Sequence, residues 1–200
     1  MVGSLGGHDE RCQLKGLIAY YKVVFSTLAG CASRQLEEVT FRRSVIPVDE
    51  LLQSAASYHA KLCCHCGEVP PLVTTACNED VLCDVCLSHF LLEQLIDVSI
   101  AAAPTDHLSL TARADGEFVR FILSNTSRQI APEVLQTFFY PISSSIESAR
   151  DGRLLGAEYI ICRQIIREHD SYFNHIGCRI KAESIPGGYA VWFTLPRSLH

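Results

Sequence analysis

The sequence predicts an α+β fold in which helices cover one face of a mixed sheet. Apolar and polar residues alternate at 108–114 before an Asp115-Gly116 turn, and strand-like runs at 178–184 and 189–195 flank Pro186-Gly187-Gly188, which predicts two hairpins. Long apolar helical patterns occupy residues 81–98 and 155–169. Because strands and helices do not alternate regularly along the chain, a sheet built from β-α-β units is not expected.

The first part of the chain is predicted to be helical. Residues 1–13 are expected to be a flexible lead-in, since MVGSLGGHDE lacks the basic start and apolar core of a signal peptide. Apolar residues then recur every three or four positions, which predicts a long helix within residues 14–46. Pro47 ends this pattern, and a second helix is expected from Leu51 to about Leu62.

Shorter elements are predicted within the remaining domain, residues 47–200. Residues 72–76 form a β-prone run, and a short helix begun by Pro132 should extend over residues 131–139. Residues 142–153 are polar and rich in turn formers, which predicts a mobile loop. The length of the chain fits one substantial domain with a short extra element rather than two full domains.

Charge and hydropathy exclude two classes of partner. The formal net charge of -5 and a pI of about 5.9, without any run of Lys or Arg, argue against a nucleic-acid surface. The longest apolar stretch, Gly16 to Ala32, is interrupted by Lys22 and is too short to cross a membrane. We therefore expect a soluble chain without membrane contact.

Ten cysteines raise the questions of disulfide bonds and of a zinc site. Without a secretory signal, reduced thiols are expected. A zinc site would combine Cys63-Cys64-His65-Cys66 and Cys77 with Cys83-Asp84-Val85-Cys86, which has CxxC spacing. Cys86 also fits the apolar helical pattern of residues 81–98, however, and the first cluster lacks a clean CxxC. We expect no metal; a zinc- or redox-responsive sensor built on Cys64 and Cys83 stays open as an alternative.

Several motifs of the second half resemble the catalytic domain of sensor histidine kinases. They are Gly116-Glu117-Phe118-Val119-Arg120-Phe121-Ile122-Leu123-Ser124, Ile130-Ala131-Pro132-Glu133, Phe138-Phe139-Tyr140-Pro141, the helix Ile161-Cys162-Arg163-Gln164-Ile165-Ile166-Arg167-Glu168-His169, and Pro186-Gly187-Gly188 followed by Phe193-Thr194-Leu195-Pro196. Their order and spacing hold over most of the chain. The resemblance implies a two-layer α/β sandwich of the histidine-kinase (GHKL, or Bergerat) ATPase type. It also implies that the long N-terminal helix is part of a dimerisation hairpin.

A narrower resemblance concerns the origin of the chain. Ala19-Tyr20-Tyr21-Lys22, Gly156-Ala157-Glu158-Tyr159-Ile160-Ile161-Cys162 and Arg167-Glu168-His169-Asp170 are similar to a divergent group from Bacteroidales bacteria. In that group a kinase-like end follows a periplasmic tetratricopeptide-repeat region and one membrane span. The resemblance implies that this chain is the cytoplasmic, C-terminal part of a membrane-anchored receptor.

The helix that holds the metal in such kinases is altered here. The family carries an Asn-x-x-x-Asn helix whose second Asn binds Mg²⁺, an ion that requires hard oxygen ligands. The matching positions in this sequence are Phe90 and Gln94. The amide of Gln94 still offers an oxygen, but Phe90 offers none. A Lys near the phosphates is replaced by Asp97, whose negative charge would repel them.

Both glycine boxes of the family are also altered. The adenine-reading Asp-x-Gly-x-Gly box matches Asn125-Thr126-Ser127-Arg128-Gln129, so that Asn125 replaces the carboxylate while Ser127 and Gln129 replace the glycines. The phosphate-cradling Gly-x-Gly box matches Gly156-Ala157-Glu158. It keeps Gly156, but Glu158 brings a carboxylate to the place where phosphates would lie.

These losses predict a degenerate histidine-kinase-like domain that acts in signal transduction as a docking module and does not bind ATP. None of the eight histidines lies in the context of a phospho-acceptor, and we expect no catalytic residue in this chain. The alternative is a divergent but active kinase domain that binds Mg-ATP and phosphorylates a histidine upstream of residue 1.

Partners are predicted from the N-terminal apolar seam. Leu14, Ile18, Tyr21, Phe25 and Leu28 have heptad spacing, which predicts a homodimer through this helix. The competing outcome is a single helix that folds back onto its own domain. A response regulator or a transcription factor is the expected downstream partner.

Overall fold

The computed structural model describes residues 41–63, 70–102, 107–127, 129–139 and 157–198. Along the chain its elements are β1 (Arg43–Pro47), α2 (Val48–Cys63), β2 (Val73–Thr75), β3 (Asp80–Asp84), α3 (Val85–Ala102), β4 (Leu108–Asp115), β5 (Phe118–Asn125), α4 (Pro132–Thr137), α6 (Ala157–Tyr172), β6 (Ile180–Ile185) and β7 (Gly188–Pro196). The expected lead-in and the polar loop at 142–153 lie outside the described residues. So does most of the long helix expected within 14–46.

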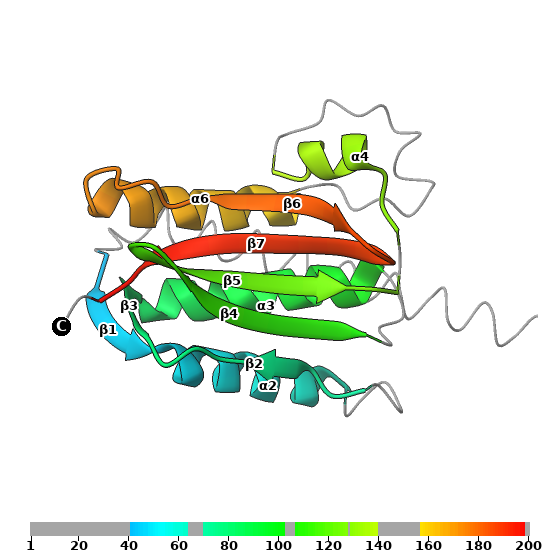
Figure 1. Cartoon of the computed structure of the whole chain (residues 1–200), viewed down its shortest axis with the longest axis horizontal. Helices are drawn as coiled ribbons and strands as arrows, with labels where there is room; N and C mark the ends of the chain where they lie inside the picture. Colours follow the sequence, from blue (N-terminus) through cyan, green and yellow to red (C-terminus); the bar gives the residue numbers. More distant parts are fainter. Residues whose placement is uncertain (1–40, 64–69, 103–106, 128, 140–156, 199–200) are drawn as a thin grey trace, which may run out of the picture.

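The described elements form two layers. Figure 1 shows helices α2, α3 and α6 side by side behind a five-stranded sheet. The strand order is β2-β4-β5-β7-β6, with β2 parallel to β4 and every other neighbouring pair antiparallel. Helix α3 is central and packs against both α2 and α6. The predicted α+β class and the two-layer sandwich are therefore confirmed.

The core lies between the sheet and the three helices. Alternate residues of β5 point into it, among them Phe121, whose ring stacks on Phe193 of β7 at 4.9 Å between centroids. Leu91 and Leu95 of α3 and Ile165 of α6 are almost fully buried against this face. Each such side chain contributes about 1.5–3 kcal/mol of burial free energy, so the contact between α3, α6 and the central strands stabilises the domain.

Both hairpins occur where the sequence predicted them. Gly116 begins the two-residue turn between β4 and β5 with φ +64°, a conformation that costs residues with a Cβ more than glycine. Pro186 and Gly187, with φ +80° at the glycine, form the turn between β6 and β7. This proline-then-glycine order is typical of a type II turn. The helices expected at 51–62, 131–139 and 155–169 correspond to α2, α4 and α6.

Two predicted helix boundaries are wrong. Residues 80–84 form β3 rather than the first turn of the helix predicted at 81–98, and β3 pairs antiparallel with β1. Val81 and Cys83 are both buried and stand two residues apart, which is the spacing of a strand. The same spacing also occurs within helical apolar patterns, so it did not distinguish the two. Since residues 43–46 belong to β1, the N-terminal helix does not extend to residue 46.

The cysteines of the described residues differ in their burial. Cys83 and Cys162 are fully buried. Cys86, expected to be a small apolar residue of the helix core, is exposed in the first turn of α3. Cys64 and Cys66 lie outside the described residues. Within the described part of the chain, no helix is both long and apolar enough to cross a membrane.

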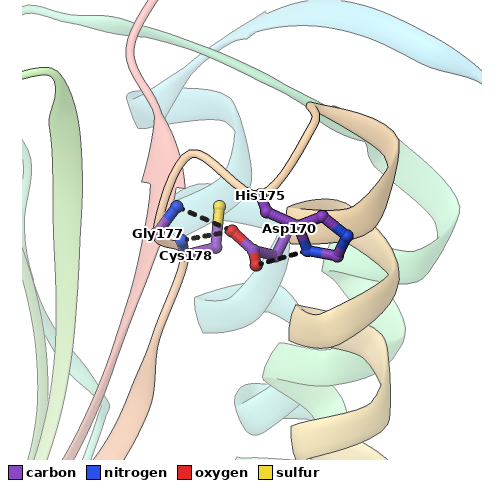
Figure 2. Close-up of polar contacts among 4 residues, drawn as sticks. All are labelled: Asp170, His175, Gly177 and Cys178. Carbon is purple, nitrogen blue, oxygen red and sulfur yellow. Dashed lines mark hydrogen bonds and ion pairs between the residues drawn. The ribbon is translucent and has the colours of Figure 1, made fainter.

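A carboxylate closes the turn between α6 and β6. Oδ1 of Asp170 accepts hydrogen bonds from the backbone N–H groups of Gly177 (2.7 Å) and Cys178 (2.8 Å), and Oδ2 faces Nδ1 of His175 at 3.3 Å (Figure 2). The turn contains Asn174 at φ +61° and His175 at φ +60°, which favour glycine and are strained for other residues. Asp170 therefore holds a backbone conformation that the chain would otherwise leave.

The same contacts set the charge of Asp170. Burial alone would raise the pKa of this carboxyl, but the two backbone N–H donors and His175 outweigh that effect and hold the pKa below its ordinary value. A lowered pKa means that the ionised carboxylate stabilises the fold at neutral pH. This stabilisation is lost as the pH falls through the pKa of the folded state, below 3.8.

We predict that Asp170→Asn lowers the free energy of unfolding by about 1–2 kcal/mol at pH 7, because charge-assisted hydrogen bonds become neutral ones. Urea denaturation at pH 7 and near pH 3 measures the effect, and the difference from wild type should shrink at the lower pH as the wild-type carboxyl becomes protonated. Glu183→Gln, an exposed site on β6, is the matched control for the lost charge. An equal loss in both variants would contradict the role of Asp170.

Candidate functional site

Three of the predicted site residues lie on α3, in different surroundings. Phe90 is half-buried and packs against the apolar core. Gln94 is buried, with 2% of its surface exposed. Asp97 lies one turn further along, where α3 faces α2. Helix α3 therefore carries a buried amide and a partly buried carboxylate within one turn of each other.

Asp97 is held by a tyrosine of the neighbouring helix. The hydroxyl of Tyr58 on α2 lies 2.9 Å from both carboxylate oxygens of Asp97. Burial raises the pKa of Asp97 to about 6; the Tyr58 hydrogen bond opposes this rise, and the nearby charge of Glu93 adds to it. Burial likewise raises the pKa of Tyr58 above its ordinary value. The carboxylate of Asp97 therefore belongs to the contact between α2 and α3.

Asn125 ends β5 and is enclosed by its own hydrogen bonds. Only 1% of its surface is exposed. Its Oδ1 accepts the backbone N–H of Ser127 at 2.9 Å, and its Nδ2 donates to the carbonyl of Ser99 on α3 at 3.5 Å. The first contact is an Asx-type turn, which fixes the chain as it leaves the sheet. Asn125 thus joins the end of β5 to the C-terminal part of α3.

A close backbone approach lies beside Asn125. An added Cβ at Gly188, the first residue of β7, would lie 1.9 Å from the carbonyl oxygen of Asn125 and 2.7 Å from Cα of Thr126. No side chain fits this space. Glycine at position 188 therefore brings β7 into contact with the segment where the adenine-reading box was expected.

The remaining predicted positions are less enclosed or lie outside the described residues. Ser127 and Gln129 are exposed, where the family would have glycines. Gly156 lies outside the described residues, and α6 begins at Ala157. The backbone of Glu158 is helical, while its side chain is outside the description. The structure thus brings Asn125 and Ser127 together near α3 and directs Asp97 toward α2.

Sequence reasoning missed a buried polar network at the opposite end of α3. Asp84 accepts hydrogen bonds from the backbone N–H groups of Leu87 (3.1 Å) and Arg42 (2.8 Å), which makes it the N-cap of α3. Its own backbone N–H donates to Nε2 of His169 on α6 at 3.2 Å. Nε2 is also 3.4 Å from the hydroxyl of Ser88.

His169 is neutral in this arrangement, because an acceptor Nε2 leaves the proton on Nδ1. Nδ1 donates to the carbonyl of Ile165, one turn earlier in α6, at 2.9 Å. His169 is fully buried and serves as a structural link rather than a proton-transfer group. The sequence signal for this N-cap is an Asp three residues before the first buried leucine of the helix. Because the predicted helix begins before Asp84, the signal was not recognised.

An aromatic cluster covers the same end of α6. The ring of Phe41 stacks on Tyr172 with centroids 4.1 Å apart and meets His169 and Phe173 edge-on. The guanidinium of Arg43 lies 5.8 Å from the ring of Phe173. The first described residues of the chain are therefore anchored to the last turn of α6.

We predict a stability effect of Asp97 that depends on pH. Its folded-state pKa of about 6 lies above the ordinary 3.8, so the free energy of unfolding should fall as the pH rises from about 4 to about 6. Asp97→Asn removes this titration and should gain stability relative to wild type over that window. Urea denaturation at both ends of the window measures it.

Tyr58→Phe gives the converse check. It removes the hydroxyl donor from an ionised, partly buried carboxylate, so it should cost more above pH 6 than at pH 4. A stability difference between Asp97→Asn and wild type that is the same at both pH values would contradict the raised pKa.

Comparisons with known proteins agree with this geometry. The family model for the histidine kinase-, DNA gyrase B- and HSP90-like ATPases matches residues 87–199, more than half of the chain. No curated protein matches the chain in sequence.

Solved structures of histidine kinases have the same fold. The catalytic domain of the histidine kinase ThkA is 20% identical with a TM-score of 0.62, covering 80% of this chain and 99% of that domain. A mycobacterial sensor histidine kinase, MprB, is 13% identical with a TM-score of 0.59, covering 80% of this chain and all of that one.

A third structure, of full-length histidine kinase ShkA, contains AMPPNP. It is 18% identical with a TM-score of 0.57, and the match covers 81% of this chain but 32% of ShkA. At these identities the likeness concerns the fold. Together with the family match over α3, the central strands, α6 and the closing hairpin, it establishes that the chain belongs to the histidine kinase-, DNA gyrase B- and HSP90-like ATPase family.

Proposed function

We propose that this chain is a degenerate histidine-kinase-like ATPase domain that serves as a docking module in signal transduction and does not bind Mg-ATP. The observation that carries the proposal is the enclosure of Asn125, whose side-chain oxygen and nitrogen are both engaged by backbone groups of the protein. A residue that recognises adenine needs an exposed hydrogen-bond acceptor. Here the acceptor, Oδ1 of Asn125, is occupied by the backbone N–H of Ser127 in the turn that Asn125 itself begins.

The metal position supports the same conclusion. Magnesium requires several oxygen ligands in near-octahedral geometry. Phe90 supplies none, and Gln94 is buried, with 2% of its surface exposed. The carboxylate of Asp97 is held against α2 by Tyr58. The residues at these positions do not fit a magnesium-bound nucleotide, and we derive no phosphoryl-transfer step for them.

The proposed phosphate position is unfavourable by charge. Glu158 stands near the start of α6, where bare backbone N–H groups would otherwise attract phosphates. Unpaired polar groups and like charges in a pocket each cost about 1–3 kcal/mol, so several together would remove most of the affinity of an ordinary nucleotide site.

We predict that isothermal titration of the full chain with ATP and magnesium shows no binding into the millimolar range, which corresponds to only about -4 kcal/mol. ShkA, whose solved structure contains AMPPNP, is the positive control under the same conditions. Micromolar binding that Gly156→Arg abolishes would refute the proposal. That result would favour the alternative, a divergent domain that binds Mg-ATP and phosphorylates an upstream histidine.

The upstream connection is part of the proposal. The domain expected at residues 47–200 would begin with β1, at Arg43, and the segment from residue 14 up to β1 would provide the dimerising element. A homodimer would form through Leu14, Ile18, Tyr21, Phe25 and Leu28, which lie outside the described residues. Phe41 and Arg42 then pass any movement of that element directly to α6 and α3 through the contacts at Tyr172 and Asp84.

We predict a dimer in light scattering for the wild type and a monomer for Phe25→Glu, because a charge in an apolar heptad seam opposes its pairing. Val45→Glu is the matched control, since Val45 is 53% exposed on β1 and outside the seam. It should remain dimeric. A wild-type monomer at high concentration would remove the dimer.

The proposed context is a two-component system. ThkA has been solved in complex with the response regulator TrrA; that ThkA chain is 18% identical, with a TM-score of 0.61, and the match covers 98% of this chain and 53% of ThkA. A response regulator or a transcription factor is the proposed partner here. We further propose that the domain is the cytoplasmic end of a Bacteroidales receptor with tetratricopeptide repeats and one membrane span.

A further inference from the structure

A groove follows the edge of the sheet on the far side of α6 from α3. Its volume is about 520 Å³, and it is bounded by α4, by α6 and by a continuous run of β6 and its approach, residues 178–182. Figure 1 shows β6 at the edge of the sheet, with α6 behind it and α4 above its C-terminal half. Arg163 of α6 donates from Nη1 to the carbonyl of Phe139 at 3.3 Å and so ties the end of α4 to α6.

The open edge of β6 offers backbone groups to this groove. The N–H of Thr194 on β7 donates to the carbonyl of Arg179 at 2.9 Å, so Arg179 forms a hydrogen-bonded pair with β7. In an antiparallel pair such residues alternate with ones whose N–H and C=O point the other way. With the register Ile180↔Phe193 and Ala182↔Val191, the polar groups of Ile180 and Ala182 point away from β7. Within the described residues, no strand pairs with that edge.

Side chains around the groove have a definite pattern. On the helix side, Leu135 of α4, Ile166 of α6 and Ile180 of β6 form an apolar patch beside the polar side chains of Gln136 and Arg163. On the other face of β6, Lys181 lies across from Trp192, with Nζ 5.9 Å from the indole ring. Arg167, Arg179 and Lys181 are exposed at its rim, and within the described residues none of them pairs with a carboxylate. No acidic residue lines the groove.

We propose that this groove binds an acidic, extended segment of a partner protein, which pairs with the free edge of β6 as an additional strand. Backbone pairing to Ile180 and Ala182 provides the affinity, as in other cases of strand addition. Alternate side chains of the segment then meet different surroundings. Apolar ones enter the helix side against Leu135 and Ile166, while acidic ones face the cationic rim.

The chain as a whole has a net charge of -5, whereas the groove has cations at its rim and no acidic lining residue. Charge complementarity therefore favours an acidic partner segment at this groove. The groove deepens the docking role proposed above and rests on it. It does not involve the residues of the nucleotide positions. Two other roles for these cations exist. Cations on an edge strand protect proteins from edge-to-edge aggregation, and a basic groove can hold a small anion. The experiment below distinguishes both roles from strand addition.

The test is fluorescence anisotropy with the full chain and a labelled peptide of the length of β6 that alternates valine and glutamate. We expect saturable binding in the micromolar range, and no binding of the peptide with lysine in place of glutamate. Arg167→Glu and Lys181→Glu should each weaken binding by about tenfold or more, because each reverses a charge at the rim. Arg113→Glu, an exposed cation on β4 away from the groove, is the matched control and should bind normally.

Ala182→Pro tests the backbone pairing. It removes an N–H that points away from β7, so the hydrogen bonds between β6 and β7 remain while the additional strand loses a donor. Binding should fall at least as much as for the charge reversals, with circular dichroism confirming the fold. If Ala182→Pro does not fold, a peptide whose backbone amides are methylated at alternate residues makes the same test on the wild type and should not bind.

Three results would overturn the proposal. Absence of binding into the millimolar range would leave the cations as edge protection alone. Binding that survives both Ala182→Pro and amide methylation would exclude strand addition. Full displacement of the peptide by inorganic phosphate at millimolar concentration would indicate a small-anion site. A chain that binds no ATP and no acidic peptide would refute the groove and leave the degenerate nucleotide site intact.

Discussion

The arrangement of the domain depends on one buried carboxylate. Asp84 is 4% exposed, and a carboxylate removed from water requires hydrogen-bond donors to offset the loss of solvation. It obtains them from two elements, the backbone of Arg42 before β1 and that of Leu87 in α3, while its own N–H binds His169 of α6. The start of the domain and two of its helices are therefore fixed at a single point. The direction that α3 takes from this point decides which of its residues reach the end of β5.

Helix α6 connects the two ends of the molecule. Its last turn carries the aromatic contacts with Phe41 and the hydrogen bonds of His169, and its first residue, Ala157, belongs to the second glycine box. At 1.5 Å per residue, a helix of 16 residues is about 24 Å long. Under the proposed docking role, this helix is the rigid element that joins the upstream segment to the face bearing the groove. Such a connection is physical contact, and measured coupling between its ends would be needed to call it allosteric.

Local patterns predicted the fold well where local chemistry decides it. The two hairpins follow from Asp115-Gly116 and Pro186-Gly187, whose backbone preferences act within four residues. Strand β3 was missed because its partner β1 lies some 37 residues away, and an alternating Val81 and Cys83 also fit the helical pattern that follows. The residues that contact the predicted site residues are equally distant from them in sequence. Nothing near Asp97 indicates Tyr58, 39 residues earlier, and nothing near Asn125 indicates the carbonyl of Ser99.

Gly188 belongs to the Pro186-Gly187-Gly188 motif that resembles histidine kinases, but its role in this structure concerns the packing of the sheet and not the nucleotide. A methyl group there would meet the backbone of Asn125 and Thr126, so that β7 could no longer pair with the end of β5. The requirement comes from the sheet itself and holds whether or not a nucleotide is present. Glycine at this position therefore reports the fold, and nucleotide binding has to be judged from residues that the fold leaves free to change.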